Sequence, residues 1–110
     1  MLVTYVLTAD RKLGDALIQR FNELDGVSAR RFDADVQPGF RRVVVTPVAD
    51  CPEGRCAELT TRGFRVIVLA PVARASEETQ YLRAGAIAYL PMMVDGAALV
   101  DTLREALSSG

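Results

Sequence analysis

The chain has 110 residues, which is the length of one ordinary domain and enough to bury a hydrophobic core without cross-links. Half of the residues are hydrophobic and a quarter are charged, a composition that excludes an intrinsically disordered protein. The formal net charge of −1 provides no field for nucleic acid or an anionic membrane, and no apolar run is long enough to span a bilayer. We therefore expect a single cytoplasmic domain over residues 1–110 that binds neither membrane nor nucleic acid.

The chain begins with a predicted strand, helix and strand. Residues 2–7 form an apolar run rich in β-branched and aromatic residues, which indicates a strand. Residues 11–24 carry apolar side chains at three- and four-residue spacing, which predicts an amphipathic helix with Asp10 as its N-cap. Residues 25–26, an Asp-Gly pair, end this helix, and residues 27–32 predict the second strand.

The connection to the third strand is too short for an ordinary crossover helix. Residues 33–42 separate the second strand from the apolar run at residues 43–45, and Pro38 and Gly39 interrupt this stretch. There is room for about one helical turn. We expect the second helix to be shortened or absent.

The second half of the chain continues to alternate strands and helices. Residues 52–63 have room for about two helical turns, and residues 66–69 predict a fourth strand. A further helix opens near Ser76, and residues 86–90 predict a short last strand. The apolar positions of a closing helix are Leu99, Val100, Leu103, Ala106 and Leu107. Because the apolar runs do not alternate with polar residues, both faces of the sheet must be buried under helices. This indicates a doubly wound parallel α/β sheet.

Three sequence motifs in the last third of the chain carry a family resemblance. Residues 66–70 read VIVLA, residues 81–86 read YLRAGA and residues 89–91 read YLP. This pattern resembles the receiver domains of bacterial response regulators, in which a strand ends in Thr or Ser, a helix closes on RAGA and the last strand ends in YLPKP or YLLK. The resemblance spans essentially the whole chain. It implies a five-stranded parallel sheet with the flavodoxin-like strand order 2-1-3-4-5.

The resemblance also implies where phosphoryl-transfer chemistry would lie. Receivers carry an acceptor aspartate after the third strand, a hydroxyl after the fourth and a lysine after the fifth. The acceptor position falls on Thr46, a register supported by Gly54, while the hydroxyl falls on Ala70 and the lysine on Met92. A threonine hydroxyl is no acyl-phosphate acceptor, so this chain resembles a degenerate, aspartate-less pseudo-receiver.

The acidic pair that binds Mg²⁺ in the family is depleted as well. It falls on Thr8 and Ala9, or on Ala9 and Asp10 if the register shifts by one residue. At most one carboxylate therefore remains for a hard divalent cation. We expect no Mg²⁺, no other metal or cofactor, and no enzymatic activity. Asp50, in the following loop, is a weaker candidate for a displaced acceptor.

Two further features of the pocket have alternative interpretations. Tyr89 falls on the family's switch aromatic, although a tyrosine at the rim of the core is the favoured interpretation. Cys51 and Cys56 flank the loop after the third strand. Reduced thiols are favoured in the cytoplasm, and a redox pair that closes over the former pocket is the alternative. With no histidine in the chain, the two cysteines cannot complete an ordinary zinc site.

The last strand and its neighbours offer a candidate contact surface. It comprises Tyr81, Ile87, Met92, Met93 and Val94. If these apolar residues are exposed together, they suit a protein partner or a homodimer formed through the last two helices and the last strand. Equally, Ile87 and one methionine could fill the space left by the missing lysine.

The leading hypothesis is a phosphorylation-independent receiver domain that acts in signal transduction through protein contacts or dimerisation. The resemblance implies that it could be the N-terminal regulatory part of a longer transcription regulator, although this domain has no basic recognition helix of its own. The alternative is a small-molecule sensor that uses the emptied crevice, whose residues are Thr8, Asp10, Thr46 and Ala70.

Overall fold

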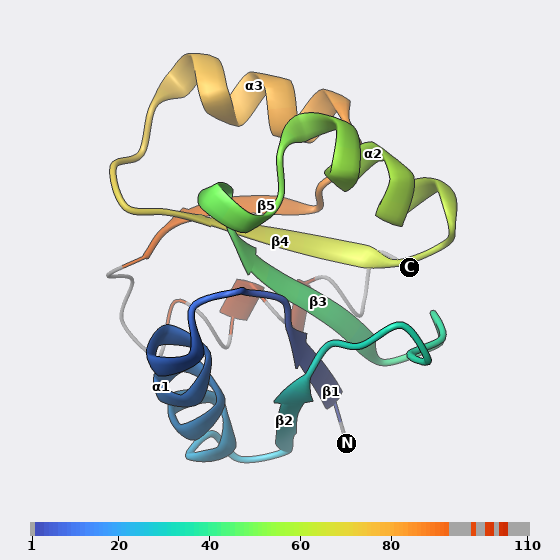
Figure 1. Ribbon diagram of the computed structural model, residues 1–110, viewed down its shortest axis with the longest axis vertical. Helices are drawn as coiled ribbons and strands as arrows, with labels where there is room; N and C mark the ends of the chain where they lie inside the picture. Colours follow the sequence, from blue (N-terminus) through green and yellow to red (C-terminus); the bar gives the residue numbers. More distant parts are fainter. Residues whose placement is uncertain (1, 93–97, 99–100, 103, 106–110) are drawn as a thin grey trace.

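The computed structural model describes residues 2–92, 98, 101–102 and 104–105, and these form a three-layer α/β domain (Figure 1). Five parallel strands make one sheet in the order β2-β1-β3-β4-β5, which confirms the predicted topology. The strands are β1 (Leu2–Val6), β2 (Val27–Arg31), β3 (Arg42–Pro47), β4 (Arg65–Ala70) and β5 (Ala88–Pro91).

Helices cover both faces of the sheet. They are α1 (Arg11–Asn22), α2 (Glu53–Thr61), α3 (Ala75–Arg83) and the short 3₁₀ helix η1 (Val48–Asp50). Figure 1 shows α2 and α3 on one side of the sheet and α1 on the other. Residues 98, 101–102 and 104–105 are helical and lie on the α1 side (Figure 1). The predicted apolar positions of the closing helix, Leu99, Val100, Leu103, Ala106 and Leu107, lie outside the described residues.

Alternate side chains of the central strands build two separate cores. Val43 and Val45 of β3 face the α1 side, where they pack with the fully buried Phe21. Val44 faces the opposite side and packs with Leu59 of α2. Because both faces are covered, β3 and β4 are buried along almost their whole length, which explains their unbroken apolar sequences.

The predicted N-cap of α1 and the glycine turn after it are both present. Asp10 is the N-cap, and its side chain accepts a hydrogen bond of 3.0 Å from the Leu13 N–H. The helix ends at Asn22, two residues earlier than predicted, and Gly26 takes a φ of +79° in the turn that follows. The Asn22 side chain then bonds both the N–H and the C=O of Ala29 in the edge strand β2.

No helix lies between β2 and β3, as the short connection predicted. Residues 32–41 cross this region as an irregular segment (Figure 1), and Val36 packs into the core on the α2 side. The segment ends in a tight turn in which the Arg42 N–H donates to the Gly39 carbonyl at 3.2 Å. Arg41 lies within this turn with a φ of +65°.

The later elements differ from the predictions only at their ends. Helix α3 begins at Ala75, one residue before the predicted start near Ser76. Strand β5 begins at Ala88, two residues later than predicted, because the Ala86 N–H bonds Tyr81 at the end of α3. Among the described residues, no helix is both long enough and apolar enough to cross a membrane.

Candidate functional site

Two loops meet at the carboxyl ends of β1 and β3, where the sequence predicts the phosphorylation crevice. Asp50 accepts a hydrogen bond of 2.6 Å from the Thr8 hydroxyl and one of 2.9 Å from the Ala9 backbone N–H. These two bonds use both oxygens of the carboxylate. Hydrogen bonds to an ionised group are stronger than neutral ones, so they hold the two loops together. We call this arrangement the Asp50 clasp.

Asp10, the other carboxylate at the crevice, has a structural task. Its Oδ1 caps α1 through the Leu13 N–H, and its own N–H donates to the Thr8 hydroxyl oxygen at 3.1 Å. Thr8 therefore accepts a bond from Asp10 while it donates to Asp50. The Asp10 side chain is exposed at the start of α1 and belongs to the local turn.

Thr46, Ala70 and Met92, which the resemblance assigns to the acceptor, the hydroxyl and the lysine, lie at or next to the carboxyl ends of β3, β4 and β5. Thr46 is fully buried inside β3, and its hydroxyl donates to the Pro47 carbonyl at 3.3 Å. Ala70 ends β4 and is also fully buried, and its carbonyl accepts from the Met92 N–H at 2.8 Å. Met92 packs against the core on the α1 side. Together these three residues supply no carboxylate and no positive charge.

This set of residues does not fit a magnesium ion. Mg²⁺ requires near-octahedral oxygen coordination and usually keeps several water ligands, so a protein site has to offer it one or two carboxylates that are free to coordinate. Both Asp50 oxygens already bond protein donors, and Asp10 caps a helix. In the part of the chain that the structure describes, no group of three His, Cys, Asp or Glu side chains could hold a metal ion.

Tyr89 is turned into the protein, between β5 and α3. The residue is only 7% exposed, and its hydroxyl donates to the Glu77 carboxylate while it accepts a hydrogen bond of 3.2 Å from the Arg74 N–H. Burial and the bond to Glu77 raise the pKa of Tyr89 above its ordinary value. A switch function for this tyrosine stays a prediction.

Tyr81 stacks on Tyr89 with ring centroids 6.0 Å apart, and it is buried. Its hydroxyl donates to the Cys51 carbonyl at 2.7 Å, and burial raises the pKa of Tyr81 to about 12. The prediction that Tyr81 belongs to an exposed contact surface is therefore wrong. On the helix it occupies the core-facing position, and Leu82, the next residue, faces outward with 46% of its surface exposed.

The two cysteines lie in the core on the α2 side. Both are free thiols and both are fully buried. Burial raises the pKa of Cys51 to about 11 and also raises that of Cys56. Because the thiolate is the reactive form, these raised pKa values disfavour thiol chemistry at neutral pH. A redox pairing of the two stays a prediction.

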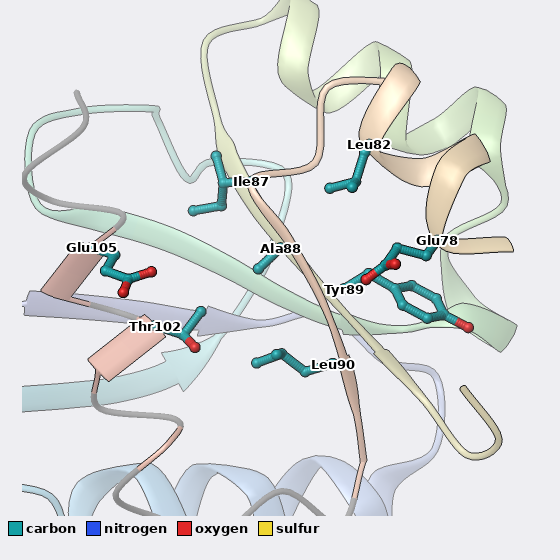
Figure 2. A pocket seen from close by; sticks show the side chains of 8 residues that line it. All are labelled: Glu78, Leu82, Ile87, Ala88, Tyr89, Leu90, Thr102 and Glu105. Atoms are coloured by element: carbon teal, nitrogen blue, oxygen red, sulfur yellow. The ribbon is translucent and has the colours of Figure 1, made fainter. Parts of the chain in front are cut away.

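A groove of about 420 Å³ lies between α3, β5 and the closing helix (Figure 2). We call it the α3–β5 groove. It is lined by Glu78, Leu82, Ile87, Ala88, Tyr89, Leu90, Thr102 and Glu105. Of the described residues that line it, the two charged ones, Glu78 and Glu105, are both acidic, and Leu82 and Ile87 are among the most exposed large apolar side chains that the structure describes.

The groove contains one residue of the predicted contact surface, Ile87, which is 37% exposed. Met92 is only partly exposed and packs on the core, while Met93 and Val94 lie outside the described residues. Sequence reasoning missed Leu82. The available signal was its place next to Tyr81 on an amphipathic helix, because adjacent residues point about 100° apart around the helix axis and one of them can lie at the edge of the apolar face.

Comparison with known proteins supports the fold strongly and the sequence relationship weakly. No protein-family model matches the sequence, and neither does any curated protein. Among solved structures, a response regulator receiver protein from Pseudoalteromonas atlantica superposes with a TM-score of 0.74 at 17% identity, covering 97% of this chain and 98% of its own. A response regulator from Thermotoga maritima reaches 0.78 at 14% identity and covers 98% of both chains.

A third match carries a more specific description. A DNA-binding response regulator of the LuxR family from Staphylococcus aureus superposes with a TM-score of 0.73 at 14% identity, covering 97% of this chain and 99% of its own. Each match extends over nearly the whole of both chains. The chain therefore has the fold of a response-regulator receiver domain.

Proposed function

We propose that this domain regulates a partner in signal transduction through protein contacts and without phosphorylation. The observation that carries the proposal is the Asp50 clasp. A phosphoryl group on a receiver-like crevice would bring a charge of about −2 and would need donors or cations around it. Here the Thr8 hydroxyl and the Ala9 N–H, which could serve as such donors, are already bound to a carboxylate.

The charge balance of the crevice supports the same conclusion. Asp50 adds a negative charge beside the crevice, and Met92 is the residue that the resemblance assigns to the position of the family's neutralising lysine. Without a metal ion or that lysine, like charges would repel at short range in a partly buried site. The clasp also joins the two loops without any ligand. The clasp therefore favours one arrangement of the crevice.

The α3–β5 groove supplies the surface through which such a domain could act. Exposed apolar side chains beside acidic ones form the kind of patch that binds proteins. The partner would be a protein or a second copy of the domain, in the cytoplasm. As in regulators described as DNA-binding, an effector domain on the same polypeptide would read DNA, and this domain would control it.

The alternative of a small-molecule sensor in the emptied crevice is less well supported. Thr46 and Ala70 are fully buried, and the clasp spans the loops above them. Both features leave the crevice filled by the protein's own groups. The contact-based function is therefore the one that the geometry favours.

A spectroscopic titration tests the proposal. Beryllofluoride with Mg²⁺ mimics a phosphorylated aspartate in receivers, so a conventional receiver domain serves as the positive control. We expect the amide resonances of Ala9, Asp50 and Ile87 to stay unchanged in this protein. Saturable shifts at both the crevice and the groove, lost in Asp50→Asn, would instead establish a phospho-switch.

A further inference from the structure

Phe40 is the most exposed of the large apolar residues that the structure describes, with 74% of its surface accessible. It lies in the segment that replaces the second crossover helix. The Arg41 guanidinium stacks over the Phe40 ring, 5.6 Å from its centroid. Arg42 follows directly and lies alongside Gly39. We call Phe40, Arg41 and Arg42 the Phe40 knob.

The backbone holds this knob in place. The Arg42 N–H closes the turn onto the Gly39 carbonyl, and the Arg42 side chain donates to the Gln37 carbonyl at 3.0 Å. Arg41 has a φ of +65°, a conformation that side chains other than glycine adopt at a cost. A strained turn that presents an aromatic ring to solvent is the kind of feature that occurs at binding sites.

The α3–β5 groove has the complementary chemistry. Figure 2 shows Ile87, Ala88 and Leu82 between Glu105 on one side and Glu78 on the other. An aromatic ring in this groove would bury apolar surface on both partners. Arg41, which is exposed and follows the ring, could then reach the exposed Glu78 carboxylate at the rim, where charge-assisted hydrogen bonds and ion pairs form readily.

We propose that the Phe40 knob of one copy binds the α3–β5 groove of a second copy. This inference rests on the proposed function, because it uses the groove as the contact surface and names its occupant. A symmetric pairing of two grooves would bring two acidic rims together, which like charges disfavour. A basic aromatic knob instead meets an acidic apolar groove.

The geometry makes this contact head-to-tail. The knob lies at the start of β3 and in the turn before it, whereas the groove is lined by residues of α3, of β5 and its approach, and of the closing helix, so the two surfaces do not overlap. Each copy that donates its knob keeps an open groove, and association continues into chains. A contact of this small size falls in the weak class, below about 1,200 Å² of buried surface. Self-association therefore rises with concentration and becomes strong when a longer polypeptide brings copies together.

Sedimentation velocity over a range of concentrations up to the millimolar level tests the inference. The wild-type protein forms dimers and longer species as its concentration rises. Phe40→Ser removes the knob, and Ile87→Lys places a positive charge in the groove that repels the arginines. We expect each variant alone to associate at least about tenfold more weakly. The matched control is Val72→Ser, which changes another exposed apolar residue, 64% accessible, outside the knob and the groove.

Mixing the two variants gives the decisive result. Phe40→Ser keeps an intact groove and Ile87→Lys keeps an intact knob, so the mixture forms a one-to-one dimer that grows no further. Circular dichroism verifies that each variant is folded, and Leu82→Lys replaces Ile87→Lys if the latter is not.

Three results would overturn the inference. One is a wild-type protein that stays monomeric throughout, and another is a mixture that stays monomeric. The third is association that Ile87→Lys abolishes and Phe40→Ser does not, which would mean that grooves pair symmetrically. In that last case the groove would remain a contact surface, and the proposed function would stand while its occupant was wrong.

Discussion

The Thr8 hydroxyl donates a 2.6 Å hydrogen bond to Asp50, although 42 residues separate the two in sequence. The bond joins the loop that follows β1 to the short helix that follows β3. A second bond from the Ala9 N–H reaches the other oxygen of the same carboxylate. Both loops lie at the carboxyl edge of the sheet, where open α/β folds bind their ligands. A side chain of the protein itself thus joins these two loops.

Removing the clasp should loosen both loops and lower stability. We expect Asp50→Ala to lower the free energy of unfolding by about 1–2 kcal/mol, because two bonds to a partly exposed carboxylate are lost. For a domain of this size that corresponds to a fall in Tm of roughly 4–8 °C per kcal/mol. Thermal denaturation measures it. A Thr8→Val and Asp50→Ala double-mutant cycle isolates the pair, and additive effects would mean that the two side chains do not interact.

An aspartate placed at the acceptor position should not enable the domain to accept a phosphoryl group. Thr46 is fully buried within β3, so Thr46→Asp places a carboxylate among apolar side chains. We expect it to cost about 3 kcal/mol or more, while the matched Thr46→Val changes stability little. Urea denaturation compares the two variants. A stable Thr46→Asp protein that accepts a phosphoryl group would show that the crevice is more open than the structure indicates.

The edge of the sheet depends on Asn22. Its side chain accepts from the Ala29 N–H at 2.7 Å and donates to the Ala29 carbonyl at 3.3 Å, so it pairs the outward-facing groups of the edge strand. Asn22→Ala should cost about 1 kcal/mol and accelerate hydrogen exchange at Ala29. Asn22→Asp keeps the acceptor and loses the donor, so we expect it to protect Ala29 to an intermediate degree. Equal exchange rates in all three proteins would contradict this account.

Buried acidic groups should make the fold unstable at alkaline pH. Burial raises the pKa of Cys51 from 9.0 to about 11, so the unfolded chain loses this proton at a lower pH than the folded chain does. The contribution of Cys51 is fully present below pH 9.0 and is lost as the pH rises to about 11. Tyr81, raised from 10.0 to about 12, acts in the same direction at higher pH.

Cys51→Ala tests this alkaline dependence. We expect the variant to be less stable at neutral pH, because it leaves a small cavity, but to lose less stability between pH 9.0 and 11 than the wild type does. Urea denaturation at several pH values measures the slope for both proteins. Parallel curves would mean that Cys51 does not ionise during alkaline unfolding.

The sequence predicted the elements of the fold because their signals are local. The apolar run of β3, the Asp10 cap and the short connection after β2 each follow from neighbouring residues. The clasp could not be found this way. Asp50 was visible as a loop carboxylate, but its bond to Thr8 depends on how two distant loops pack. The prediction that Tyr81 belongs to an exposed surface was wrong for a related reason, because periodicity alone did not decide whether Tyr81 or Leu82 faces the core.

Under the proposed function, the crevice does not support phosphoryl transfer. Intact-protein mass spectrometry after incubation with acetyl phosphate and Mg²⁺ tests it most directly, with a conventional receiver domain as the positive control. The structure predicts an unchanged mass for the wild type and for Asp50→Asn, because the clasp and Met92 leave neither a free acceptor nor a neutralising charge. A stoichiometric mass gain of one phosphoryl group on the wild type, absent in Asp50→Asn, would contradict the account.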